Sequence, residues 1–189
     1  HFNFIKNSSS DFIFLLRNIN TYGDLSGTYK NYESYSLLSS ALYNFRYPLF
    51  KETQKNKKFL TPVASFRYSP NPGLNYKNEE TLIRYDDLFK LDRINNKTVE
   101  KGGSATIGLE YKNQDTNDRD KLNLKLAVNF RAEEDEDLPL SSSLNKKTSD
   151  IIGYSGVNIT ENLSLNYNFS IEENLSGTNY SLISADYNG

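Results

Sequence analysis

The sequence predicts an all-β fold: an antiparallel up-and-down meander of about eight or nine strands, a segment of a large transmembrane outer-membrane β-barrel. Apolar and polar residues alternate with a period of two along several segments, a pattern typical of strands with one apolar and one polar face. These segments are about ten residues long, which a tilted strand needs to cross a bilayer, whereas soluble strands usually have five or six residues. Long and short connections also follow each other in turn, as they do in outer-membrane barrels.

The three clearest strands lie in the second half of the chain. In residues 122–131 every even position is apolar and nearly every odd position is polar. Residues 163–172 repeat this alternation without an error, and residues 104–112 show it again. Each segment is therefore predicted to present an apolar face to lipid and a polar face to the barrel interior.

Less regular strands are expected in the first half and near the end of the chain. The candidates are residues 11–20, 41–47, 60–68, 150–159 and 179–187, with a possible short strand at 2–6. Pro48 ends one candidate and Pro62 interrupts the next. Because proline cannot donate to a strand ladder, we expect a bulge at Pro62 that bends the sheet.

The connections between these strands fall into two alternating sets. Long connections are expected at 21–35, 70–102 and 133–149, with a shorter one at 173–178 on the same side. Short connections at 7–10, 114–120 and 160–162, and a moderate one at 49–58, alternate with them. Outer-membrane barrels have short periplasmic turns and longer extracellular loops, so we expect the three long loops outside the cell. Residues 1–189 as a whole are expected to form a partial transmembrane barrel domain.

Composition narrows the class of protein. The 189 residues carry a net charge of -2, and 37% are apolar although 14 Tyr and 11 Phe are present. A near-neutral chain gives no electrostatic reason to expect nucleic acid, and no apolar run approaches the length of a transmembrane helix. The chain begins at His1 and has no Met, so we expect a segment of a longer protein.

The polar positions of the regular strands are predicted to face the barrel lumen. These lumen-facing candidates are Thr106, Glu110, Lys112, Lys125, Asn129, Arg131, Ser164, Asn166 and Asn168. A polar interior suits a water-filled or plugged barrel that handles polar or amphipathic cargo.

The sequence offers little for catalysis, and we expect no enzymatic activity and no cofactor. His1 is the sole histidine and Cys is absent, so no internal imidazole or thiol can serve nucleophilic chemistry. An acidic run in the third long loop is a weak candidate site for Ca²⁺ or Mg²⁺, which prefer carboxylate oxygens. The run consists of Glu133, Glu134, Asp135, Glu136 and Asp137. We expect it to be a solvated charge run, and we expect no metal.

Several short motifs, in order, resemble the C-terminal barrel domain of the LptD family of LPS-assembly proteins, also called organic solvent tolerance proteins. The matching stretches are 45–49 with 60–64, 66–70, 86–89 with 91–94, 106–111 and 149–153. Within the large loop, Asp86, Asp92 and Arg93 stand at the positions of the family-like loop motif. The resemblance covers roughly residues 40–160.

The resemblance implies a function in physical transport, with no bond made or broken. It implies a location in the outer membrane of a Gram-negative bacterium, delivery of lipopolysaccharide to the outer leaflet, and a plug formed by an LptE-like lipoprotein inside the barrel. The lipid bilayer and lipopolysaccharide are then the expected partners. Two alternatives stay open: a generic porin or receptor barrel, and a secreted adhesive β-sheet protein.

Overall fold

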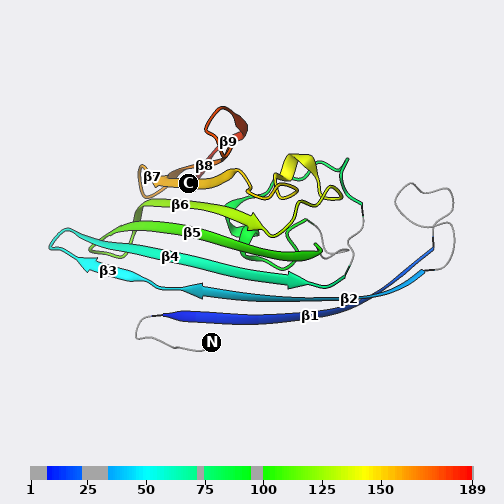
Figure 1. Ribbon diagram of the computed structural model, residues 1–189. Helices are drawn as coiled ribbons and strands as arrows, with labels where there is room; N and C mark the ends of the chain where they lie inside the picture. Colours follow the sequence, from blue (N-terminus) through cyan, green and yellow to red (C-terminus); the bar gives the residue numbers. More distant parts are fainter. Residues whose placement is uncertain (1–7, 23–33, 72–74, 95–99, 189) are drawn as a thin grey trace.

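The computed structural model describes residues 8–22, 34–71, 75–94 and 100–188, which form one nine-stranded antiparallel sheet (Figure 1). The strands are β1 (Ser9–Thr21), β2 (Ser34–Arg46), β3 (Leu49–Glu52), β4 (Asn56–Ser69), β5 (Gly102–Asp115), β6 (Asp120–Arg131), β7 (Ile151–Asn158), β8 (Leu163–Ile171) and β9 (Thr178–Tyr187). Sequence neighbours pair throughout, except that β3 continues the line of β2 and pairs with β4. The predicted all-β antiparallel meander is confirmed. The expected short strand at 2–6 lies outside the described residues.

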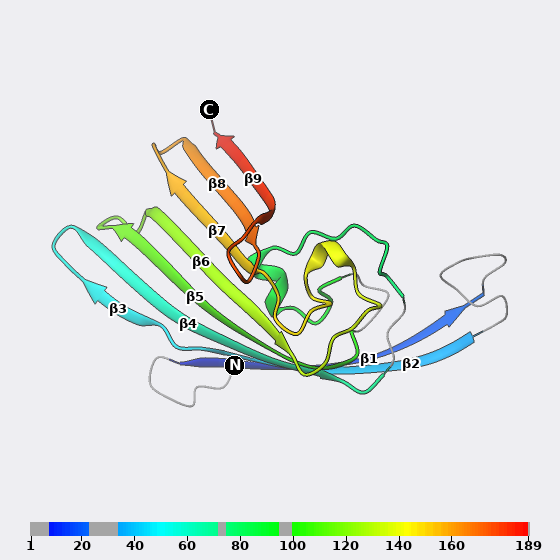
Figure 2. The same cartoon turned by 45° about the horizontal axis from the view of Figure 1, so that its top comes forward.

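The sheet is curved, with one concave and one convex face (Figure 2). β1 and β9 are its two edges, so the described sheet is an open wall. Strict alternation in β4, β5 and β6 places apolar side chains on the convex face, where Phe66, Ile107 and Leu126 are all largely exposed. Positions of the opposite parity face the concave side, where Arg67, Thr106 and Asn129 are buried.

Two strand boundaries differ from the sequence expectation. β2 begins at Ser34, earlier than the expected 41–47, because its first half pairs with β1 out to Thr21. The moderate connection expected at 49–58 instead contains β3, which pairs with β4 through a tight turn at 53–55. In both places, residues that were expected in a loop belong to a paired strand.

Pro62 does not form the bulge that its position suggested. It pairs with Leu109 in unbroken register with β5. The irregularity lies on the neighbouring strand, where β2 ends at Arg46 and β3 begins at Leu49. Pro62 stands opposite this break and its carbonyl accepts the Tyr47 N–H at 3.1 Å. A residue without an N–H is tolerated there because the facing strand is interrupted.

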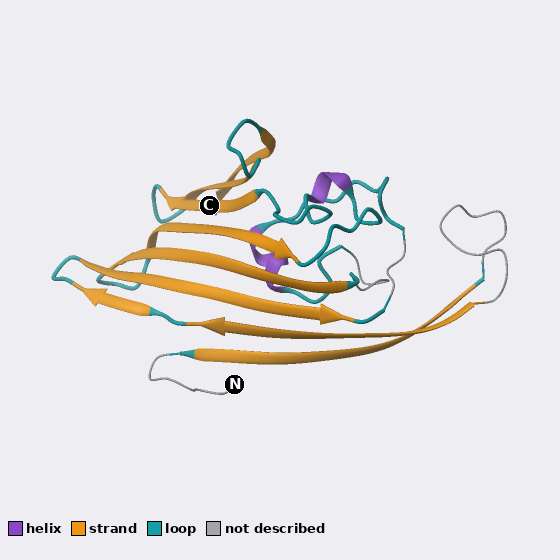
Figure 3. Cartoon of the chain, viewed as in Figure 1, coloured by secondary structure: helices purple, strands orange, loops and turns teal. Residues whose placement is uncertain are grey.

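The long connections lie at one end of the strands and most short turns at the other, as expected, while the short connection between β8 and β9 lies at the end of the long loops. The turns at 53–55, 116–119 and 159–162 are short and share one end. At the other end, residues 75–94 and 133–149 fold back over the concave face as loops with two short 3-10 helices, η1 (Tyr85–Phe89) and η2 (Leu140–Ser142) (Figure 3). The loops expected at 21–35 and 70–102 also contain residues 23–33, 72–74 and 95–99, which lie outside the described ranges.

The apolar core lies between these two loops and the sheet. It is formed by loop residues together with one wall residue each of β6 and β7: Ile83, Tyr85, Leu88, Leu138, Leu144, Ala127 and Ile152. Burial of this cluster fixes the loops against one end of the concave face. Within the described ranges, no helix is long or apolar enough to cross a membrane.

Candidate functional site on the concave face

The nine polar positions singled out from the sequence all lie on the concave face. Strand register aligns them across the wall: Thr106 stands opposite Asn129, and Glu110 opposite Lys125. Asn129 donates from Nδ2 to Thr106 Oγ1 at 3.0 Å. Lys112 Nζ lies 3.2 Å from Asp120 Oδ2 near the turn end. Arg131 marks the loop end of the same face, so these positions span nearly the whole length of β5 and β6.

The polar row continues across β8 to the edge of the sheet. Asn166, opposite Gly156 of β7, accepts the Tyr154 hydroxyl proton at its Oδ1 at 2.6 Å and donates from Nδ2 to Asp186 at 2.7 Å. Ser164 and Asn168 occupy the same face of β8 and are half-buried. This part of the wall is therefore polar and partly open to solvent.

A buried cluster of charges occupies the loop-covered end of the concave face. Glu100, 2% exposed, accepts two hydrogen bonds from Arg93, at 2.8 Å on Oε1 and 2.6 Å on Oε2. Arg131 Nη1 donates to Glu100 Oε2 at 3.0 Å, and its Nη2 contacts Asp135 Oδ2 at 3.3 Å. Arg131 thus links the Glu100 carboxylate of one long loop to the Asp135 carboxylate of the other.

Arg67 completes this cluster from β4. Its Nη2 lies 2.6 Å from Glu100 Oε2, but its N–H bonds are not directed at the oxygen, so the contact is an ion pair without a hydrogen bond. The buried Nε and Nη1 of Arg67 find no hydrogen-bond partner within the described residues. Three arginines thus surround Glu100 and Asp135, leaving an excess of one positive charge in a buried site.

The protonation of Glu100 follows from these neighbours. Burial alone would raise the pKa of its carboxyl, but the attraction of Arg67, Arg93 and Arg131 outweighs burial and lowers the pKa to about 2. Glu100 is therefore ionised over the whole physiological range. A buried charge of this kind is maintained only while its partners stay in place.

The three loop-motif residues fasten the large loop to the wall. Asp86 Oδ1 accepts from Lys125 Nζ of β6 at 2.9 Å. Asp92 Oδ2 accepts from Arg17 Nη2 of β1 at 3.0 Å. Arg93, besides its bonds to Glu100, donates to Ser104 Oγ of β5 at 3.2 Å. The motif therefore links the loop to three separate strands.

The acidic run does not behave as a uniformly solvated segment. Glu133, Glu134 and Glu136 are exposed, but Asp135 is 2% exposed and paired with Arg131. The expectation of a solvated charge run is therefore wrong at Asp135, because the loop turns this side chain inward onto the arginine cluster. Across the part of the chain that the structure describes, no three acidic, His or Cys side chains are placed to hold a metal ion.

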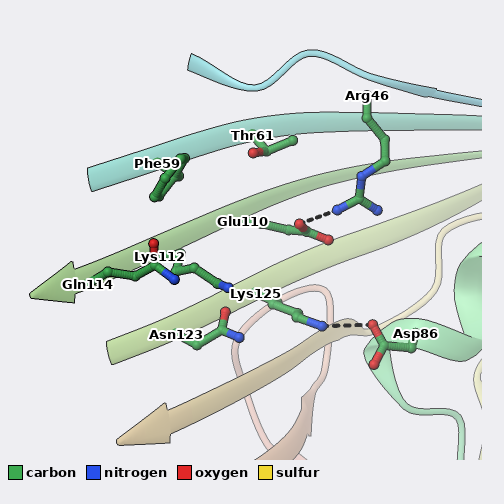
Figure 4. A pocket seen from close by; sticks show the side chains of 9 residues that line it. All are labelled: Arg46, Phe59, Thr61, Asp86, Glu110, Lys112, Gln114, Asn123 and Lys125. Carbon is green, nitrogen blue, oxygen red and sulfur yellow. Dashed lines mark hydrogen bonds and ion pairs between the residues drawn. The ribbon is translucent and has the colours of Figure 1, made fainter. Parts of the chain in front are cut away.

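A polar hollow of about 580 Å³ lies at the open, turn-side end of the concave face (Figure 4). Its lining comes from β2, β4, β5, β6 and η1: Arg46, Phe59, Thr61, Asp86, Glu110, Lys112, Gln114, Asn123 and Lys125. Arg46 pairs with Glu110, and Lys125 pairs with Asp86. Four charges in the hollow therefore form two ion pairs within it, while Lys112 pairs with Asp120 beside it.

Tyr85 joins the hollow to the covered end. Its hydroxyl donates to Glu110 Oε1 at 3.0 Å, and its ring packs on Phe89 with centroids 5.2 Å apart. Burial first, and then the nearby Glu110 carboxylate, raise the pKa of the Tyr85 hydroxyl, so the hydroxyl stays protonated as a donor. Lys125 Nζ lies 5.2 Å from the centre of the Tyr85 ring, within the range of a cation–π contact.

Sequence reasoning missed Arg67, Glu100 and Tyr85. Arg67 could have been found, since it has the same parity in β4 as the other concave positions, among them Thr61, Ser65 and Ser69. Glu100 and Tyr85 lie in a loop without periodicity, and their partners on the strands, Arg67 and Arg131 for Glu100 and Glu110 for Tyr85, are distant in the sequence. No local pattern marks them.

These features place the chain in the class of outer-membrane β-barrel proteins: long antiparallel strands, an apolar convex face and a polar concave face. The sequence model of the LptD family, described as LPS transport system D, matches residues 5–189, and the chain belongs to this family. The expected resemblance is thereby confirmed over nearly the entire chain. A comparison with curated proteins gives no match.

Membership in the LptD family indicates the general function of the chain. The LptD family takes part in lipopolysaccharide transport and assembly at the outer membrane of Gram-negative bacteria, and it is a transport family rather than a family of enzymes. This favours lipopolysaccharide transport over the two alternatives, a generic porin or receptor and a secreted adhesive protein.

Proposed function

We propose that this chain forms part of the wall of the outer-membrane barrel that delivers lipopolysaccharide to the outer leaflet. The convex face contacts lipid, and the concave face lines the lumen. The loops at 21–35, 70–102 and 133–149 lie on the extracellular side, and the short turns lie on the periplasmic side.

The observation that carries this proposal is the chemical difference between the two faces of one sheet. On β6, Leu124 and Leu126 are partly exposed on the convex face, while Lys125 and Asn129 make polar contacts on the concave face. Hydrocarbon favours exposed leucine and strongly disfavours lysine, whereas a hydrated lumen reverses both preferences. A sheet with this division fits a bilayer on one side and water or a polar partner on the other.

The open hollow supports an LptE-like lipoprotein as the lumenal partner. Its ion pairs around Arg46 and Glu110 are partly exposed and can exchange for contacts with a polar protein surface. The opposite end of the concave face is already filled by the chain's own loops. In this proposal the loops close the extracellular end of the lumen, and the lipoprotein plug occupies the space below them.

Two adjacent cysteine substitutions test the orientation of the wall. Leu124→Cys and Lys125→Cys lie on opposite faces of β6, and the chain itself has no Cys. In the full-length protein in native outer membranes, a membrane-impermeant maleimide should modify Lys125→Cys and not Leu124→Cys, with the unsubstituted protein as background. Equal modification of both positions, or the reverse preference, would overturn the proposal.

Delivery of lipopolysaccharide is tested separately. In cells whose sole copy of the full-length protein can be depleted, loss of the protein should lower newly made lipopolysaccharide at the cell surface while the intact lipid accumulates inside. Unchanged surface lipopolysaccharide after depletion would contradict the delivery role.

A further inference from the structure

An apolar slot lies on the convex face near the loop end of the strands, outside the concave site described above. It has a volume of about 520 Å³ and runs over β1, β2, β4, β5 and β6. Its floor consists of small residues, Ala41, Gly103, Ala105 and Ala132, and aromatic rings stand around it. The slot is therefore a depression in a face that is otherwise covered by large apolar side chains.

Strand register explains how the slot forms. Ala105 lies between Phe66 of β4 and Phe130 of β6 in one cross-strand row. In the next row toward the loops, Gly103 stands opposite Tyr68. The rings are 41 to 60% exposed, so they project from the wall on both sides of the small residues. Two consecutive rows thus carry a small residue on β5 where a large one would fill the sheet surface.

We propose that this slot binds one acyl chain of lipid A in the outer leaflet. The proposal rests on the proposed function, which places this end of the strands in the outer leaflet and lipopolysaccharide beside it. The slot is continuous with the apolar convex face, and its walls offer ring surfaces that suit an extended hydrocarbon chain. Phe66 of β4 and Phe130 of β6 flank Ala105 in one row, so the strip of small residues between the rings is a single strand wide, which suits one acyl chain.

The charged groups near the loop end of the slot do not form a site for a lipid headgroup. Lys101 precedes Gly102 there, but its Nζ lies 3.9 Å from Oδ1 of Asp135, which is turned inward onto the arginine cluster of the concave side. Glu133 and Glu134 are exposed near the same end. The acyl chain therefore carries the recognition.

The slot can be filled without disturbing the backbone. A Cβ placed on Gly103 would meet Tyr68 Cδ2 at 3.9 Å and the Arg67 carbonyl oxygen at 4.0 Å, which are ordinary van der Waals distances. Gly103→Leu therefore blocks the slot while leaving the strand pairing intact. The exposed Leu16 of β1, on the same face and toward the same end but outside the slot, provides a matched control position.

Photocrosslinking tests the proposal in the full-length protein in native outer membranes. A photoreactive phenylalanine analogue replaces Phe66, whose ring stands beside the small-residue floor, in one variant and Leu16 in the other. Crosslinked lipopolysaccharide is detected by immunoblot and mass. Burial of two further methylene groups changes occupancy by about tenfold, so we expect about tenfold more crosslinked lipopolysaccharide at position 66. Gly103→Leu should reduce the yield at 66 to the level at 16.

The possible results are distinguishable. Equal yields at the two positions, or no effect of Gly103→Leu, would overturn the slot while leaving the orientation of the wall intact. Crosslinking of phospholipid rather than lipopolysaccharide at 66 would overturn the assignment to lipid A. Absence of any lipid crosslink at both positions would overturn the proposed function together with this inference.

Discussion

The two ends of the concave face use the same chemistry in different surroundings. At the loop-covered end, Glu100 is 2% exposed and meets three arginines. At the open end, the side chain of Glu110 is 16% exposed, and that of its partner Arg46 is 41% exposed. One carboxylate is enclosed by loops and a hydrophobic core, and the other lines a hollow that solvent can enter.

The difference in solvent access determines what each carboxylate contributes. Water screens the open pair and can replace either partner, so the pair adds little to stability and remains available for exchange. At the covered end no water can take the place of Glu100, and its loss leaves buried arginines without a counter-charge. The covered end therefore holds the two loops in place. The open end is the part of the concave face whose contacts can be exchanged for contacts with a binding partner.

The largest expected effect is the loss of the buried carboxylate. Glu100→Gln should destabilise the folded protein by about 3–5 kcal/mol, because Arg67, Arg93 and Arg131 then stay buried without their central anion. The measurement is urea-induced unfolding of the full-length protein in detergent. Glu110→Gln is the control at the open end, with an expected change of at most about 1 kcal/mol. Equal changes for both variants would contradict the division into a covered and an open end.

Low pH should destabilise the covered end of the concave face before it destabilises the rest of the sheet. The pKa of Glu100 is lowered to about 2 in the folded protein, whereas in the unfolded chain it has its ordinary value near 4.5. Because the unfolded state binds this proton more tightly, the stabilisation is complete above about pH 4.5 and is lost as the pH falls toward 2. The loss is on the order of 3 kcal/mol. The free energy of unfolding, measured between pH 6 and pH 2.5, should therefore fall more steeply with decreasing pH for the native chain than for Glu100→Gln. Parallel curves would contradict the stabilising role of the Glu100 carboxylate.

Tyr85 connects the two ends, and its removal should have an intermediate effect. Tyr85→Phe keeps the buried ring but deletes the hydroxyl that donates to Glu110, and Arg46 remains to pair with that carboxylate. The expected loss is about 1 kcal/mol of unfolding free energy, the usual contribution of one hydrogen bond. Tyr68→Phe, on the exposed convex face, serves as the control and should leave stability unchanged. A loss of unfolding free energy as large as that of Glu100→Gln would show that the open end also holds the fold together.

The sequence predicted the open end far better than the covered end. Alternation with a period of two places Glu110, Lys112 and Lys125 on one face as soon as the strands are recognised, because strand parity alone decides their direction. It could not place Glu100, which belongs to a loop where no periodicity fixes the direction of a side chain. It also misjudged Asp135, since its burial depends on an arginine and a loop fold that the acidic run itself does not reveal.

The smallest effect on stability should come from Arg46, and this variant tests function at the open end. Arg46→Gln removes one charge from the hollow and leaves Glu110 bonded to Tyr85, so the unfolding free energy should change by less than about 1 kcal/mol. The altered charge pattern should still weaken association with the lipoprotein plug, because rim charges govern encounter and partner choice. Co-purification of the lipoprotein with the full-length protein at rising salt measures this, with Lys55→Gln at the exposed turn 53–55 as the charge-matched control. If Arg46→Gln retains the plug as well as Lys55→Gln does, the hollow is not the contact surface, and the plug binds elsewhere on the concave face.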